Sequence, residues 1–274
     1  MTWSIVTHDP SSGAFAVAVA TCAFAVGASC PFVRAGVGAV STQSMTNRYL
    51  GPAILDGLAR GLHPAAAIEG ALAGDAGSGL RQVHAVDRHG RTAAWTGQNC
   101  VEWCGSVAGE GVSVAGNMLA GEAVIAATLV AFQASATNPG ATKAGAAKPG
   151  TPNPGAPNPG AANAVAEIPL PERLMLAMLA GQAAGGDRRG RQSAAMRLIT
   201  TEDFPDLDLR VDDHADPLAE LDRLLGLWRE QAEPRLATAP RRANPAGFTD
   251  LDAIEAGWRA SSSSALGLDL RFRR

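Results

Sequence analysis

Alternating apolar and polar positions at the start of the chain predict a β-hairpin. Residues 4–7 and 14–21 both have the period-two pattern of strands, and a turn rich in Pro, Ser and Gly joins them. In the second strand Phe15, Val17 and Val19 share one face, and alanines occupy the other. Because alanines are small, we expect another layer to pack closely against that face.

The same pattern recurs along the chain and predicts eight more strands. Residues 30–34 and 36–43 follow the hairpin so closely that the first four strands are expected to form one antiparallel sheet. The remaining strands are predicted at residues 81–87, 92–96, 101–107, 111–115, 194–200 and 207–211.

Amphipathic periodicity predicts helices between these groups of strands. The helices are expected at residues 52–61, from His63-Pro64 onwards, and at residues 122–134, 171–182 and 217–229. Strand runs that alternate with paired helices suit an α+β fold with two stacked antiparallel sheets between helical layers, a four-layer αββα sandwich. The pattern alone does not separate this layout from other α+β folds.

Composition changes sharply after the third helical region. Residues 135–166 repeat Asn-Pro-Gly and Lys-Pro-Gly units among alanines, a composition that buries little apolar surface. We predict a disordered insertion between two helices, because neither side looks complete alone. Residues 1–232 are then expected to form one domain, followed by a loosely structured tail at residues 233–274.

Composition and charge narrow the class of function. The 274 residues are 46% hydrophobic and 18% charged, with a formal charge of −3, which argues against nucleic acid or an anionic membrane as partner. No signal peptide and no apolar run of about 18 residues is visible. Four cysteines are too few for a disulfide scaffold, so a reduced, cytoplasmic protein is expected. Cys100 and Cys104 have neither zinc-knuckle spacing nor nearby histidines.

The residue that follows Met1 is the first candidate for chemistry. Removal of Met1 would leave Thr2 with a hydroxyl and a free α-amine on one residue, the arrangement of an N-terminal nucleophile. The alternative is that Thr2 simply begins a first β-strand.

The densest polar segment, residues 185–193, is the second candidate. It carries Asp187, Arg188 and two further arginines between glycines, and guanidinium groups bind carboxylates or phosphates in a bidentate manner. A solvated charged turn is the alternative. No motif typical of a nucleotide phosphate cradle is present.

Three further groups of polar residues follow predicted strands. Asp212, Asp213 and His214 could ligate a metal, but a cap of the following helix is favoured. Asn117 could offer its amide to an oxyanion or serve only as a turn residue, and Gln43 and Ser44 are comparable candidates.

These segments together resemble the DUF1028 family, whose members look like N-terminal-nucleophile (Ntn) hydrolases. The resemblance covers residues 1 to about 230 in order and depends on residues 1–6, 34–40, 42–44, 49–52, 116–119, 185–193 and 208–214. It implies the αββα sandwich, with Thr2 as nucleophile and its α-amine as general base. Relatives of the proteasome type place a lysine about thirty residues downstream, where this chain has Arg34.

The resemblance implies a hydrolase that cleaves a small amide and needs no cofactor or metal. Arg34 or Arg188 would hold a substrate carboxylate, and Asn117 or backbone amides near Gln43 would form the oxyanion hole. Ser44, Asp187, Asp213 and His214 are further candidates for substrate contacts. A homodimer is compatible with this superfamily. Two alternatives stay open: a non-catalytic protein that binds an anionic metabolite, and a metal-dependent hydrolase centred on residues 212–214.

Overall fold

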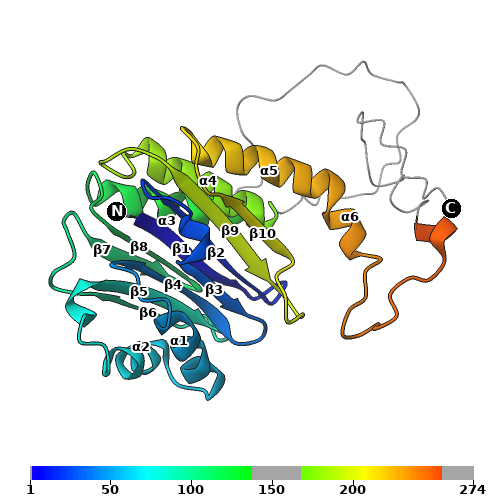
Figure 1. The fold of residues 1–274 in the computed structure, drawn as a ribbon, viewed down its shortest axis with the longest axis horizontal. Helices are drawn as coiled ribbons and strands as arrows, with labels where there is room; N and C mark the ends of the chain where they lie inside the picture. The colour runs from blue at the N-terminus through cyan, green and yellow to red at the C-terminus, as the bar shows by residue number, and fades with distance from the viewer. Residues whose placement is uncertain (1, 138–167, 255–274) are drawn as a thin grey trace.

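Ten strands form two antiparallel sheets in the computed structural model, which describes residues 2–137 and 168–254 (Figure 1). The larger sheet has the order β10-β9-β2-β1-β8-β7 and the smaller the order β3-β4-β5-β6. The strands are β1 (Thr2–Asp9), β2 (Ala14–Thr21), β3 (Pro31–Arg34), β4 (Gly38–Ser44), β5 (Arg81–Asp87), β6 (Thr92–Thr96), β7 (Gly105–Gly109), β8 (Val112–Asn117), β9 (Ser193–Ile199) and β10 (Leu207–Val211).

The first four strands do not form one sheet, so that prediction is wrong. Residues 22–30, which contain the short 3-10 helix η1 (Val26–Ala28), carry the chain from β2 in the larger sheet to β3 in the smaller one. The edge of β1 opposite β2 pairs instead with β8, which comes from much later in the chain.

Most predicted strand positions are confirmed, and the largest difference concerns β7. It begins at Gly105 rather than at residue 101. The carbonyls of Val101 and Trp103 accept hydrogen bonds from the backbone of Met118 and Leu119, so residues 101–104 close the end of β8 as a loop.

Helices cover the outer face of each sheet, which confirms an α+β fold (Figure 1). The smaller sheet carries α1 (Leu50–Ala59) and α2 (Pro64–Leu72), and the 3-10 helix η2 (Ser78–Leu80) leads into β5. The larger sheet carries α3 (Ala123–Thr137), α4 (Leu170–Ala183) and α5 (Pro217–Gln231). The alanine face of β2 packs in the same apolar cluster as α4, as predicted. In the described parts of the chain, no helix combines the length and apolarity that crossing a membrane requires.

The predicted insertion and tail fall largely outside the described residues. Residues 135–137 continue α3, and 138–166 lie outside the description. In the tail, α6 (Glu233–Leu236) and a helical turn at 251–254 are described, whereas 255–274 are not.

The two faces of β1 meet different surroundings. Trp3 and Ile5 point toward the helices and join the main apolar core, together with Leu174 and Met178 of α4. The other face points toward the smaller sheet, and strands of the two sheets contact each other there. Because side chains alternate along a strand, Thr2 and Ser4 lie on this second face.

Candidate active site at the start of the first strand

Thr2 begins a central strand of the larger sheet. Both neighbours run antiparallel to β1, so the ends of β2 and β8 lie beside its start, and the register pairs Thr2 with Thr21 and with Asn117. The Thr2 hydroxyl donates to Oγ1 of Thr21 at 3.2 Å, and Thr2 is 7% exposed. Two predicted site residues, Thr2 and Asn117, are therefore neighbours in the fold.

A chain of buried amide groups joins Asn117 to the smaller sheet. Nδ2 of Asn117 donates to Oε1 of Gln82 at 2.9 Å, and Nε2 of Gln43 donates to the same oxygen at 2.8 Å. Nε2 of Gln43 also lies 3.4 Å from the Thr2 carbonyl oxygen and 3.2 Å from that of Ala115. The Gln43 amide is thus occupied in tying the two sheets together at the start of β1.

The network continues inward to a buried histidine. The Ser4 hydroxyl lies 2.7 Å from Oε1 of Gln43 and 2.7 Å from Nε2 of His84, and is hydrogen-bonded to both. Nδ1 of His84 is hydrogen-bonded to the Ser113 hydroxyl at 3.1 Å. Burial lowers the pKa of His84 to about 3, and the ring is neutral at physiological pH.

Ser4 and His84 have the spacing of a nucleophile and its base but not the access. Both residues are 0% exposed, so no substrate can reach the Ser4 hydroxyl without opening the sandwich. The pair therefore serves the packing of the two sheets.

Asp187 anchors the 185–193 segment beside the same strand ends. Its carboxylate accepts from the backbone nitrogen of Cys22 at 2.7 Å and from that of Arg189 at 2.8 Å, and it pairs with the Arg189 guanidinium at 3.2 Å. Gly185 and Gly186 have φ of 119° and 53°, which lets the chain leave α4 in a tight turn. Arg188 is exposed and lines a cavity of about 430 Å³ with Trp3 and Gln182.

The expectation that Arg34 lies beside Thr2 is wrong. Arg34 pairs with Gly38 at the start of β4, whereas Gln43, which contacts Thr2, lies near the end of that strand. Gly38 and Gln43 are five residues apart along β4, which at ~3.3 Å per residue is about 16 Å. The Arg34 side chain binds Asp56 of α1 at 2.9 Å.

Asp213 and His214 lie at the Thr2 end of the larger sheet, where Asp213 binds a neighbouring side chain and His214 the local backbone. Asp213 accepts from the Gln192 side chain at 3.1 Å, and Nδ1 of His214 lies at the Asp216 backbone. Asp216 caps α5 by accepting from the nitrogen of Ala219 at 3.3 Å, which confirms the predicted cap. Asp212 is bound by Arg210, and in the described part of the chain no group of three or more His, Cys, Asp or Glu could hold a metal ion.

Ser44 follows Gln43 with φ of 69°, at the point where β4 turns away from the sheet. This left-handed backbone is uncommon for a residue with a side chain.

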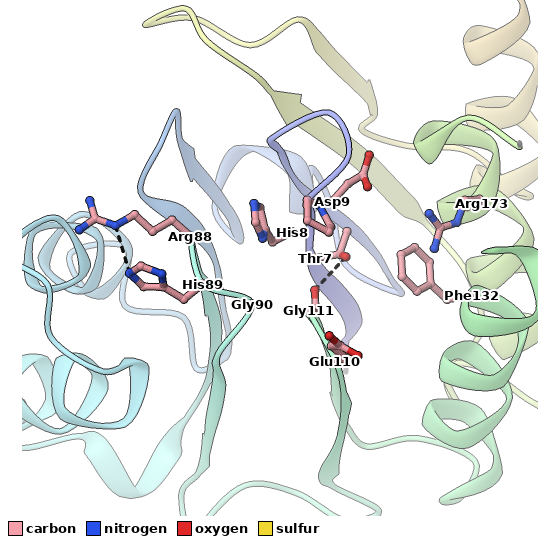
Figure 2. A pocket seen from close by; sticks show the side chains of 11 residues that line it. Thr7, His8, Asp9, Arg88, His89, Gly90, Glu110, Gly111, Phe132 and Arg173 are labelled. Carbon is pink, nitrogen blue, oxygen red and sulfur yellow. Dashed lines mark hydrogen bonds between the residues drawn. The ribbon is translucent and has the colours of Figure 1, made fainter. Parts of the chain in front are cut away.

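A cavity of about 340 Å³ lies at the opposite end of the sandwich (Figure 2). It is lined in part by Thr7, His8, Asp9, Arg88, His89, Glu110 and Arg173. His8 stacks on Phe15 with ring centroids 4.7 Å apart, and burial lowers the pKa of His8. Charges of both signs line this cavity, and Thr7 is bonded to the Gly111 carbonyl at 3.0 Å.

Sequence reasoning missed Thr21, Gln82 and the role of His84. The signal was present but indirect: Gln82 and His84 alternate with Val83 and Ala85, so one face of a buried strand is polar. A polar face inside a sandwich indicates an inter-sheet network.

These features define an α+β protein with a polar layer between two antiparallel sheets that reaches the strand ends around Thr2. The chain belongs to the family of unknown function DUF1028, whose model matches residues 2–221, and the resemblance seen in the sequence is confirmed. It is similar to the crystal structure of protein SPO2555 from Silicibacter pomeroyi, assigned to the same family, with 26% identity and a TM-score of 0.74. That similarity covers 91% of this chain and 96% of the other. No curated protein matches this chain.

Proposed function

We propose that this protein is an N-terminal-nucleophile amidohydrolase in which Thr2 attacks the carbonyl of a small amide. The observation that carries the proposal is the position of Thr2 as the first residue of β1, paired with Thr21 and Asn117. Stacked sheets between helical layers also support the Ntn-type αββα sandwich, and the family match over residues 2–221 supports one domain at about residues 1–232.

Each step of the reaction has a group to perform it. The α-amine of Thr2, with an ordinary pKa of about 7.7–8.0, takes the hydroxyl proton as Oγ1 attacks the carbonyl. One Nδ2 hydrogen of Asn117 is held by Gln82, and the other would donate to the oxyanion. The amine then protonates the leaving nitrogen, and water hydrolyses the ester at Thr2. Arg34 has no part in this scheme.

The alternative, a binding protein for an anionic metabolite, has weaker support. Arg189 and Arg191 of the predicted arginine cluster pair with Asp187 and Asp216. Arg188 is exposed and lines a cavity with Trp3 and Gln182, and it is the candidate of that segment for an anionic group of a ligand.

The proposal requires a mature chain that begins at Thr2, which intact-mass measurement tests directly. Wild type, Thr2→Ala and Thr2→Ser are then compared on a panel of N-acylamino acids and simple amides, with released amine as the readout. Thr2→Ala is expected to lose turnover by at least ~10³-fold, and Thr2→Ser to retain a measurable part of it. Full turnover by Thr2→Ala on any of these amides would refute the mechanism.

A further inference from the structure

The loop of residues 44–49 leads from the end of β4 to α1, next to the contact between Gln43 and Thr2, and presents two large apolar side chains. Gln43, the last residue before the loop, contacts the Thr2 carbonyl oxygen. Met45 is 61% exposed and Tyr49 is 86% exposed. Single exposed apolar residues are ordinary, so exposure alone decides nothing.

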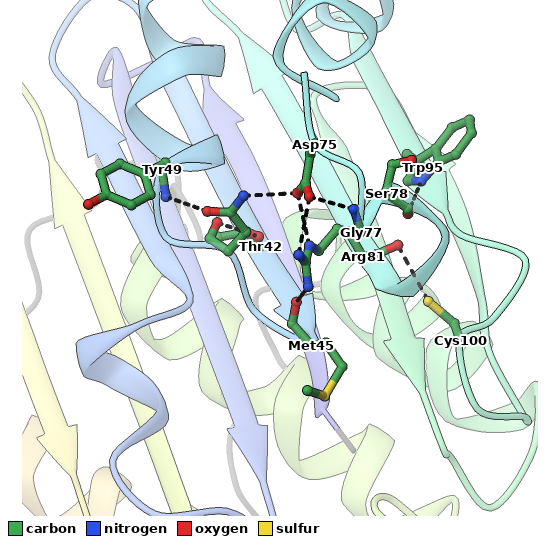
Figure 3. A network of polar contacts seen from close by, with 10 residues as sticks. Thr42, Met45, Tyr49, Asp75, Gly77, Ser78, Arg81, Trp95 and Cys100 are labelled. Carbon is green, nitrogen blue, oxygen red and sulfur yellow. Dashed lines mark hydrogen bonds and ion pairs between the residues drawn. The ribbon is translucent and has the colours of Figure 1, made fainter. Parts of the chain in front are cut away.

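This loop is held by a half-buried ion pair behind it (Figure 3). Arg81 binds Asp75 through Nε at 2.9 Å and donates from Nη1 to the Met45 carbonyl at 2.6 Å. Asn47 donates to Asp75 at 2.8 Å and accepts from the Tyr49 nitrogen at 3.1 Å. The Arg81 guanidinium, with help from Asn47, holds the pKa of Asp75 well below its usual range. The backbone that carries Met45 and Tyr49 is therefore fixed at both positions.

Further contacts fix the loop to the segments that lead into β5 and β3, the two neighbours of β4 in the smaller sheet. The Met45 nitrogen donates to the Leu80 carbonyl at 3.2 Å, beside the start of β5. On the other side, the Thr46 side chain bonds to the buried thiol of Cys30, whose pKa burial raises to about 11. Figure 3 shows the Met45 side chain pointing away from the Asp75–Arg81 pair.

Other exposed apolar side chains follow strands that end near Thr2. Phe24, two residues after the Asp187-bound Cys22, is 71% exposed. Val101, whose carbonyl accepts from the Met118 nitrogen, is 44% exposed. A fixed loop that keeps apolar side chains in water beside a candidate nucleophile is explained by a ligand that covers them.

We propose that the 44–49 loop is the apolar recognition surface of the Thr2 site, and that the substrate amide carries an aliphatic or aromatic group that packs on Met45 and Tyr49. This inference rests on the proposed function and names its substrate class. Met45 follows Gln43 by two residues, so their Cα atoms are separated by at most about 7 Å. A medium-length acyl chain or an arylalkyl group spans that distance from the carbonyl at Thr2.

The test uses hexanoylglycine and acetylglycine, which differ only in the length of the acyl chain. Binding is measured on the full-length Thr2→Ala protein by NMR of ¹³C-methyl methionine, with the Met45 resonance assigned by its loss in Met45→Ser. Hexanoylglycine is expected to shift the Met45 methyl and to bind about tenfold more tightly than acetylglycine, the ratio for partial burial at ~0.8 kcal/mol per methylene.

Matched variants separate this surface from general apolar binding. Met45→Ser/Tyr49→Ser in the Thr2→Ala background should abolish the preference for hexanoylglycine. Val130→Ser should keep it, because Val130 is 64% exposed but lies on α3, which covers the other face of the larger sheet. Unaltered far-ultraviolet circular dichroism checks that each variant is folded.

The outcomes distinguish the two proposals. If the two probes bind alike and the Met45 methyl does not move, the recognition surface is refuted, even if the wild type hydrolyses both with equal kcat/KM. If the Met45 methyl resonance shifts only when the protein concentration is changed, a second copy of the chain covers the loop and the inference is overturned. If the preference and its loss in the double variant are found but the wild type hydrolyses neither probe nor any other amide, the recognition surface stands and the hydrolase proposal fails.

Discussion

The layer between the larger sheet and its helices differs sharply from the layer between the two sheets. The first is an uninterrupted apolar core around Trp3 and Ile5. The second has smaller apolar clusters around Phe15 and around Val19, and beside β1 toward Thr2 it contains a network of hydroxyl, amide and imidazole groups. Burying such groups without partners costs more than burying methyl groups gains, and here they are hydrogen-bonded to one another.

This difference assigns separate roles to the two faces of β1. The outer face stabilises the fold through burial of apolar area. The inner face fixes the relative position of the two sheets and orients Asn117 and the start of β1, because hydrogen bonds depend on direction whereas apolar contacts do not. A site assembled from both sheets needs that kind of positioning.

The largest expected effect comes from truncation on the outer face. Ile5 is fully buried, and Ile5→Ala should lower the free energy of unfolding by about 2–5 kcal/mol. Ser4→Ala, the neighbouring change on the inner face, should cost about 1–3 kcal/mol because Gln43 and His84 lose a partner. Urea denaturation followed by circular dichroism measures both. A larger loss for Ser4→Ala would contradict the assignment of stability to the outer face.

The next effect is a pH dependence of the stability, which originates in the polar network between the two sheets. The pKa of His84 is about 3 in the folded state against 6.5 for an ordinary histidine, so the unfolded state binds more protons between these values. The stability contributed by neutral His84 is therefore complete above pH ~6.5 and is lost as pH falls toward ~3, by up to about 1.4 kcal/mol per pH unit.

The matched variant for that effect is His84→Gln, measured by urea denaturation from pH 7 to 4.5. Part of the slope of the unfolding free energy against pH should remain in His84→Gln, because burial also lowers the pKa of His8. The slope is nevertheless expected to be shallower than in the wild type. Identical slopes in the two proteins would show that His84 is not the titrating group.

The smallest effect is expected at the far end of the sandwich. Arg34 and Asp56 form an ion pair whose side chains are 40% and 56% exposed, and Arg34→Ala should cost no more than about 1 kcal/mol. Turnover of any amide hydrolysed through Thr2 should be unchanged. A large loss of kcat with a normal unfolding curve would return Arg34 to the catalytic scheme.

Local patterns were sufficient for many elements of the fold. Residues 81–87, 92–96 and 207–211 were identified as strands with the bounds that the structure has. The alanine face of β2 and the cap at Asp216 also follow from neighbouring residues alone. These features depend on side-chain alternation and on hydrogen bonds that span a few residues.

The candidate site was predicted only in part. Thr2, Asn117 and Gln43 converge, but Gln82 was missed and Arg34 was misplaced. The family resemblance placed Arg34 near Thr2, yet β3 turns back into β4, and it is Gln43, near the other end of β4, that contacts Thr2.

The sequence by itself determined where strands, helices and caps form, because each depends on the periodicity and chemistry of adjacent residues. Only the tertiary structure decided that β1 and β4 lie in different sheets and that Thr2, Gln82 and Asn117 meet. The bonds of Gln82 with Asn117 and of Gln43 with Thr2 join residues 35 and 41 positions apart, and β1 pairs with β8 although Thr2 and Asn117 stand at opposite ends of the intervening segment. No local pattern encodes such pairings, since they are chosen by how both layers bury apolar surface while every inner polar group finds a partner.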